Sequence, residues 1–149
     1  MRERFETALK NATLKQDKRR MATLRLINAA VKDRDIAARS AGRDPVSDDD
    51  ILEILTKMIK QRKESTRVYE EANRLDLAEQ EREEIEIIKE FLPQQLDDDE
   101  LREVCQEAIK ATGSQGLRDI GKCMAALKAR YSGRMDFGKA SRLVKEQLQ

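Results

Sequence analysis

The sequence contains no histidine and no tryptophan, and only two of its 149 residues are cysteine. Without histidine there is no imidazole base, no Ser–His or Cys–His pair and no histidine-ligated metal site. Cys105 and Cys123 are too few for a disulfide framework, and both lie among apolar residues at helical spacing, so we expect buried, inert thiols. The composition favours a binding or adaptor protein over an enzyme, and we assign no catalytic residue, metal or cofactor.

Aromatic residues, proline and glycine are also scarce, with aromatics at 3%, two Pro and six Gly. β-Sheets favour aromatic and β-branched residues, whereas Ala, Leu, Glu, Lys, Arg and Gln favour helices. The sequence therefore predicts an all-α fold. No apolar run approaches the roughly 18 residues of a membrane span, and the charged N-terminus lacks the apolar stretch of a secretory signal. We expect a soluble, cytoplasmic protein that does not bind a membrane.

Apolar residues recur every three or four positions along the chain, which is the spacing of one helix face. Asp17 and Ser47 are placed as N-caps, and Asp76 with Glu79 resembles a capping pair. Pro93 disfavours helical geometry in the residue before it, so a helix must end near Leu92. The predicted N-terminal helices cover about 2–14, 18–37, 48–72 and 76–92.

Residues 92–96 form the predicted joint between two subdomains. Asp97 and Glu100 begin a new helix that Gly113 ends in left-handed geometry. Two shorter helices follow at about 117–130 and 136–148, the last capped by Asp136. The predicted organisation is an N-terminal subdomain of about four helices over 1–93 and a C-terminal three-helix bundle over 94–149.

The net charge is +1, but charge is segregated along the chain. Residues 1–43 hold 12 Lys and Arg against 5 Asp and Glu, residues 44–109 hold 9 against 21, and residues 110–149 hold 9 against 3. One interpretation is that these blocks neutralise one another in the fold. The other is that a basic end meets phosphate while the acidic middle stays in solvent.

Four acidic or glycine-rich segments are candidate chemical sites. Asp48–Asp50 and Asp97–Glu100 lie where helices begin, so capping explains them, and solvated first turns do not raise a carboxyl pKa. The glutamates of 81–86 are expected to spread over a solvated helix face. Gly113–Gly116 lacks the Gly-Lys-Ser/Thr run of a phosphate-binding loop, which favours a turn.

The basic C-terminal block is a candidate nucleic-acid surface. Nine Lys and Arg lie within residues 110–145, a density suited to phosphate contacts. Only Tyr131 and Phe137 could stack on bases there, so backbone and shape recognition of structured RNA fits better than base reading. The alternative is a solvated face. The candidate phosphate contacts are Arg118, Lys122, Arg130, Arg134 and Arg142.

Several segments in a fixed order carry a family resemblance: LRLINAAVK at 24–32, KQRKES at 60–65, YEEANRLDLA at 69–78, FLPQQL at 91–96, DIGK at 119–122 and GRMD at 133–136. Together they resemble the YqeY proteins of the GatB/YqeY family over essentially the whole chain. Asn73 departs from the small residue expected before Arg-Leu-Asp.

The resemblance implies an all-helical fold with two unlike subdomains. It also implies kinship with the tail of the B subunit of the tRNA-dependent amidotransferase, a tRNA-contacting appendage outside the catalytic part. A label of carbon–nitrogen ligase with glutamine as amido-N-donor can attach to the family in this way. The residues of this chain provide no active site for that activity.

Three hypotheses follow, the leading one a non-catalytic module that binds tRNA or another structured RNA through the C-terminal bundle. The second is a protein-interaction adaptor for a translation-related protein, in which a polar cluster lies between helices or faces the partner. Arg74 and Asp76 also have a structural explanation, because helix junctions need caps. The third is an accessory to amidotransferase activity. The polar cluster comprises Arg62, Lys63, Ser65, Arg74 and Asp76.

Overall fold

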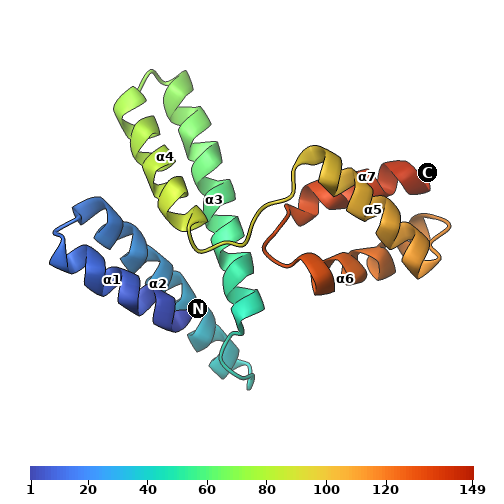
Figure 1. The fold of residues 1–149 in the computed structure, drawn as a ribbon, viewed down its shortest axis with the longest axis horizontal. Helices are drawn as coiled ribbons and strands as arrows, with labels where there is room; N and C mark the ends of the chain where they lie inside the picture. The colour runs from blue at the N-terminus through green and yellow to red at the C-terminus, as the bar shows by residue number, and fades with distance from the viewer. The chain divides into compact units, whose positions relative to one another are not determined.

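The computed structural model describes residues 1–149 and is all-α, as predicted (Figure 1). It divides into two compact units, Met1–Leu92 and Pro93–Gln149, and the predicted boundary between residues 93 and 94 lies one residue from this division. No helix combines the length and apolar character needed to cross a membrane. The elements are α1 (Arg2–Leu14), α2 (Lys18–Ser40), α3 (Asp48–Glu71), α4 (Leu75–Lys89), α5 (Asp98–Thr112), the 3₁₀ turn η1 (Leu117–Asp119), α6 (Ile120–Tyr131) and α7 (Phe137–Leu148).

Side-chain caps begin four helices where the sequence predicted them. Asp17 accepts a hydrogen bond from the Arg20 amide at 3.1 Å at the start of α2. Ser47 and Asp97 form capping boxes at α3 and α5, and Asp136 accepts from the Gly138 amide at 2.9 Å at α7. These acceptors satisfy backbone amides that have no partner within the helix. Gly113 ends α5 with a φ of 64°, as predicted.

Three helix boundaries differ from the prediction. α2 continues to Ser40, because Ala37, Ala38 and Arg39 are strong helix formers. Asp76 is not a cap: α4 begins at Leu75, its N-cap residue makes no side-chain cap hydrogen bond, and Asp76 lies within the first turn, where its charge complements the helix dipole. α4 also ends at Lys89, three residues before Leu92.

The turn between α3 and α4 places Asn73 in left-handed backbone geometry, with a φ of 57°. Asparagine tolerates this region better than other residues with a Cβ, because its short polar side chain can hydrogen-bond locally. An asparagine at position 73, in place of the small residue expected in the family that the sequence resembles, is therefore compatible with the turn.

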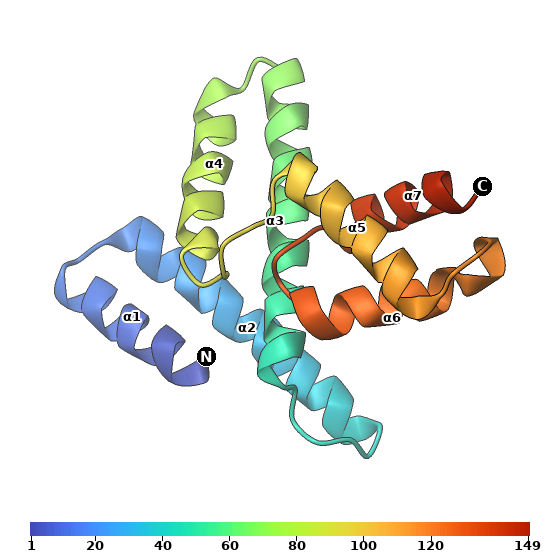
Figure 2. The same cartoon turned by 45° about the vertical axis from the view of Figure 1, so that its right-hand side comes forward.

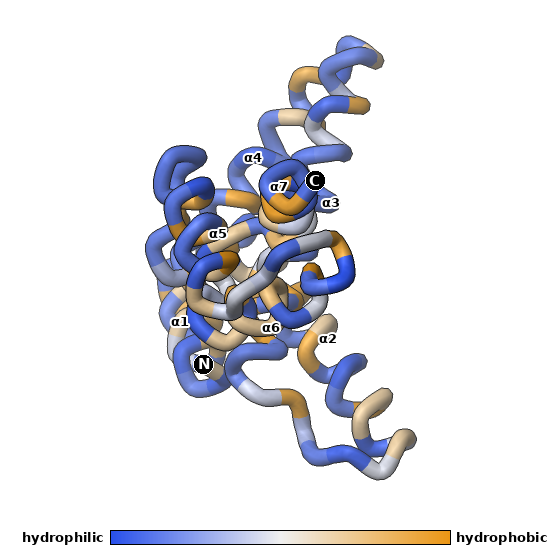
Figure 3. The backbone as a smooth tube through the Cα atoms, turned by 90° about the vertical axis from the view of Figure 1, so that its right-hand side faces the viewer, coloured by the Kyte–Doolittle hydropathy of each residue, from blue (hydrophilic) through white to orange (hydrophobic).

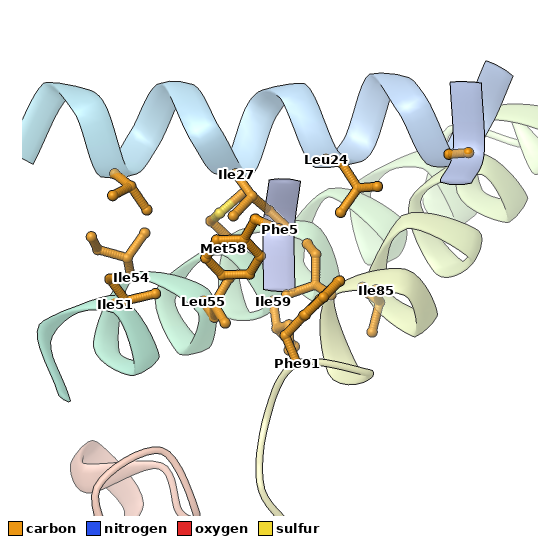
Figure 4. Close-up of a cluster of buried hydrophobic side chains, with 13 residues drawn as sticks. Phe5, Leu24, Ile27, Ile51, Ile54, Leu55, Met58, Ile59, Ile85 and Phe91 are labelled. Carbon is orange, nitrogen blue, oxygen red and sulfur yellow. The ribbon is translucent and has the colours of Figure 1, made fainter. Parts of the chain in front are cut away.

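The first unit packs α1 to α4 around one hydrophobic core. Figure 4 shows Leu24 and Ile27 of α2 directed toward Phe5 of α1 and Leu55 and Met58 of α3. Phe5 also meets the ring of Phe91 edge-on, with ring centroids 5.0 Å apart. Burying one such side chain fully contributes about 1.5–3 kcal/mol. This core uses the inner face of α2 and leaves the opposite face of that helix uncovered.

A polar network joins the start of α1 to the end of α2. Arg2 donates two hydrogen bonds to Asp35, at 2.7 and 2.9 Å, and a third to the Val46 carbonyl at 2.9 Å. Asp35 in turn accepts from the Val46 amide at 2.9 Å. The hydrogen bonds from Arg2 and then from Val46 lower the pKa of Asp35 to about 2. The network thus anchors the segment that leads into α3.

The second unit packs α5, α6 and α7 around a separate core (Figure 2). Its centre includes Leu101, Leu127 and Val144, together with the two cysteines. Both thiols are buried, as predicted, and burial raises the pKa of Cys105 to about 11 and also raises the pKa of Cys123. Such thiols are poor nucleophiles, because the thiolate is the reactive form.

We expect Asp35→Asn to destabilise the first unit at neutral pH, because the substituted amide loses its charge-assisted bonds to Arg2. Since folding lowers the pKa of Asp35, its stabilisation is present above its ordinary pKa and is lost as pH falls through about 2. Urea unfolding should therefore show a difference from the unsubstituted chain that shrinks between about pH 4 and pH 2. Asp33→Asn, an exposed site on the same helix, is the control and should show no such pH-dependent difference.

Candidate nucleic-acid interface

The three helices of the second unit carry opposite charges. α5 has five Asp and Glu against two Lys and Arg, whereas α6 has three Lys and Arg and no acidic residue. α7 adds Lys139, Arg142 and Lys145 against a single Glu146. The positive charge of this unit is therefore concentrated on α6, α7 and the turns that precede them.

Most of these cations lack an acidic partner. Of the nine basic residues between 110 and 145, Lys139 alone forms an ion pair, with Asp98 at the start of α5. In the first unit, by contrast, Arg19 and Arg20 of the basic N-terminal block reach Glu83 and Glu90 of the acidic middle. Neutralisation between blocks thus occurs in the first unit, while the C-terminal block keeps nearly all of its cations unpaired.

Two of the five predicted phosphate contacts lie together at the start of α6. Arg118 is in the 3₁₀ turn, Lys122 is in the first turn of α6, and both are exposed. Both also lower the pKa of the intervening Asp119, although the hydrogen bond that Asp119 accepts from the Gln115 amide, at 2.9 Å, has the larger effect. Asp119 is thus held by backbone amides, and neither cation forms an ion pair with it.

A second pair lies at the end of α6, around one aromatic ring. The guanidinium carbons of Arg130 and Arg134 are 5.6 and 5.7 Å from the centroid of the Tyr131 ring. Arg134 also donates to the Gln94 carbonyl at 3.1 Å, which holds its side chain in place. The fifth residue, Arg142, lies on the exposed side of α7, away from both pairs along the chain. The structure therefore forms two pairs and leaves Arg142 separate.

The Tyr131 cluster was not foreseen as a unit. A half-buried ring with two guanidiniums offers charged donors for phosphate oxygens beside a surface for stacking. Lys128 lies similarly near Phe137, at 5.9 Å from the ring centroid. The sequence did contain a signal for this cluster. Arg130 and Arg134 lie one residue before and three residues after Tyr131, so all three are close to one another in the chain.

The five residues of the predicted polar cluster do not form one site. Arg62 donates to Glu84 of α4 at 3.0 Å, and their side chains are only 14% and 11% exposed. Arg74 and Asp76 pair with each other at 3.7 Å in solvent at the start of α4. Lys63 is exposed and Ser65 half-buried on α3. The segment therefore contains an ion pair between helices and a separate turn contact.

Glu84 is buried, so its predicted place on a solvated acidic face is wrong. Besides Arg62, it receives a hydrogen bond from Gln80 at 3.4 Å and lies 3.9 Å from Arg19 of α2. Burial, and then the charge of Glu84, raises the pKa of nearby Glu81. The overlooked signal was spacing, because Glu84 precedes the core residue Ile88 by four positions and so shares its helix face.

A hollow lies in the first unit, between α1, the start of α2 and the segment that ends α4. It has a volume of about 780 Å³ and is open to solvent. Its lining includes three basic residues, Arg4, Lys15 and Arg20, and three acidic ones, Glu3, Asp17 and Glu90. Arg20 pairs with Glu90, and Arg4 lies over the Phe91 ring. This balanced, partly paired lining favours neither anions nor cations.

Comparison with known proteins gives a family and two curated relatives. The family model described as Yqey-like protein matches residues 2–148. A protein of Lachancea thermotolerans named altered inheritance of mitochondria protein 41, mitochondrial, is 37% identical over 86 residues, which are 58% of this chain and 44% of that protein. An uncharacterized protein of Schizosaccharomyces pombe is 39% identical over 57 residues, 38% of this chain and 46% of that protein. The match spans less than half the length of each relative.

The Arg62–Glu84 pair predicts a structural effect of substitution. Arg62→Ala should lower the free energy of unfolding by about 3 kcal/mol, because it leaves the buried Glu84 carboxylate without its main partner. The double variant Arg62→Met with Glu84→Met should recover much of that loss, since it also removes the buried charge. Urea unfolding followed by circular dichroism measures both.

The matched control is Arg67→Ala on the same helix. Arg67 pairs with Glu64 and Glu71 in solvent, so its loss should lower the free energy of unfolding far less than the loss of Arg62 does. If Arg62→Ala were no more destabilising than Arg67→Ala, the pair between α3 and α4 would not have the structural role assigned to it.

Proposed function

This chain belongs to the YqeY-like protein family, and from that premise we propose that it is a non-catalytic helical module that binds tRNA or another structured RNA through its C-terminal unit. The observation that carries the proposal is the set of cations on η1, α6 and α7 that have no carboxylate partner. The resemblance to the tRNA-contacting tail of the amidotransferase B subunit supports tRNA as the RNA class.

Unpaired cations suit phosphate binding for an energetic reason. A cation in an internal ion pair must give up that partner before it binds phosphate, whereas the exposed Arg118, Lys122 and Arg130 have none to lose. Each phosphate that they neutralise releases condensed counterions, which drives association at low salt. Four of the five proposed contacts are arginine, whose planar guanidinium binds phosphate oxygens in a bidentate manner.

The spacing of the two pairs fits a strand of helical RNA better than an isolated phosphate. Lys122 and Arg130, one from each pair, are eight residues apart on α6, which corresponds to about 12 Å along the helix axis. That distance covers several nucleotides of one strand. With Tyr131 as the aromatic ring between the second pair, recognition would rest on backbone and shape, with at most local stacking.

Cellular context is part of the same proposal. We place the activity in the cytoplasm, where tRNA and translation-related proteins are available as partners. The name of the Lachancea relative places that protein in mitochondria. Amide transfer is not part of the proposal, because the proposal rests on the charge of this surface.

RNA binding can be measured by titrating the full chain into fluorescently labelled, unfractionated tRNA at about 50 and 200 mM salt. Arg130→Gln combined with Arg134→Gln should weaken binding and reduce the slope of log K against log salt by about two, one for each lost phosphate contact. Circular dichroism confirms that the variant is folded.

The control is Arg67→Gln combined with Arg82→Gln, which removes the same charge from ion-paired arginines of the first unit. This variant should bind tRNA as the unsubstituted chain does. The proposal fails if tRNA does not bind at the lower salt concentration, or if both double variants weaken binding equally.

A further inference from the structure

The outer face of α2 has an apolar stripe that no part of the chain covers. Opposite the core residues Leu24, Ile27 and Val31, exposed positions recur at alternating spacings of four and three residues. Leu26 is 48% exposed and Ile36 is 56% exposed. In Figure 3 the α2 tube changes repeatedly between hydrophobic and hydrophilic colours along its length. We call this stripe the α2 seam; its residues are Ala22, Leu26, Ala29, Asp33 and Ile36.

A row of four cations runs beside the seam. Lys18, Arg25, Lys32 and Arg39 are each seven residues apart, so they follow one line along the helix. All four are exposed and none forms an ion pair, although Arg39 contributes to the low pKa of Asp35. Other arginines of the same unit, such as Arg20 and Arg82, are paired with glutamate. The row therefore retains its full charge at the edge of an apolar stripe.

This combination is the pattern of one half of a helix–helix interface. Alternating four- and three-residue spacing gives the seam that packs against a second helix, and the flanking charges select the partner and its orientation. The seam runs from Ala22 to Ile36 within the 23-residue α2, which is about 21 Å of helix and provides two heptads of contact. We infer that the α2 seam docks one amphipathic helix of another protein, whose apolar stripe is flanked by a heptad row of Asp or Glu.

Charge excludes a second copy of the same helix as the best occupant. In an antiparallel pair of α2 helices, the basic row of one would face the basic row of the other, and like charges there disfavour association. In a parallel pair, the basic row of one α2 would face the other flank of its partner's seam. Ala30 and Ala37 lie on that flank and provide no carboxylate. An acidic partner helix satisfies the row in either orientation.

The composition of the seam favours a helix over RNA or lipid. Asp33 lies in the middle of the seam and would repel phosphate, whereas a partner helix can oppose it with a Lys or Arg that also sets the register. Ala22 and Ala29 are small, which permits close approach of a second helix but gives little area for insertion into a bilayer. This inference is independent of the proposed RNA surface, which lies in the other unit.

The test uses two synthetic helical peptides with the same Leu and Ile seam and one seam Lys opposite Asp33. One peptide carries Glu at the flanking heptad positions and the other carries Lys. Binding of each labelled peptide to the full chain is measured by fluorescence anisotropy. We expect the Glu peptide to bind at least tenfold more tightly than the Lys peptide. Arg25→Glu combined with Lys32→Glu should reverse that preference.

Substitution in the seam provides the second measurement. Leu26→Lys combined with Ile36→Lys should weaken binding of the Glu peptide at least tenfold, and because both side chains are exposed, the fold should be retained by circular dichroism. Val68→Lys, at a comparably exposed apolar residue of α3, should leave binding unchanged.

Three results would overturn the inference. The first is failure of the Glu peptide to bind, or equal binding of both peptides. The second is a dimer of the unsubstituted chain in sedimentation equilibrium that the Leu26→Lys and Ile36→Lys variant abolishes, which would make the occupant a second copy. The third is a loss of tRNA binding in the Arg25→Glu and Lys32→Glu variant, while the Leu26→Lys and Ile36→Lys variant still binds tRNA and the Glu peptide as the unsubstituted chain does. That result would make this face an RNA surface.

Discussion

Four of the seven α-helices begin at a side chain that accepts a hydrogen bond from the backbone of its own first turn. Three of those caps are aspartates: Asp17, Asp97 and Asp136. Other acidic residues, such as Glu84 and Glu90, pair with arginines of α2 and α3. Because these caps and ion pairs hold carboxylates at fixed places, and α6 contains no carboxylate at all, the cations of α6 have no acidic neighbour on their own helix.

The unpaired cations are not distributed at random. In the second unit they lie on η1, α6 and α7, where α6 has no acidic residue at all. In the first unit a row of them follows the outer face of α2 beside an apolar stripe. The two surfaces differ in chemistry, since one combines arginine with an aromatic ring and the other combines heptad charges with a hydrophobic seam. Because of that difference, we propose an RNA as the partner of the second unit and an acidic helix as the partner of α2 in the first unit.

Local signals in the sequence predicted much of this fold. Capping residues and the stop at Gly113 predicted where helices begin and end to within a few residues, because those interactions span three or four positions. Glu84 was misjudged because its burial depends on Arg19 and Arg62, which come from other helices. The grouping of Arg130 and Arg134 on Tyr131 likewise required the geometry at the end of α6. Contacts between helices and the backbone path after α6 were therefore the parts that the local pattern could not supply.

The central claim is that the second unit presents its unpaired cations to RNA. Amide chemical-shift mapping of the ¹⁵N-labelled full chain with unfractionated tRNA at low salt tests it most directly, because the measurement reports every backbone position at once. The account predicts shifts concentrated between residues 117 and 145, with the largest around Tyr131. Shifts confined to α1 through α4, or none at saturating tRNA, would contradict it.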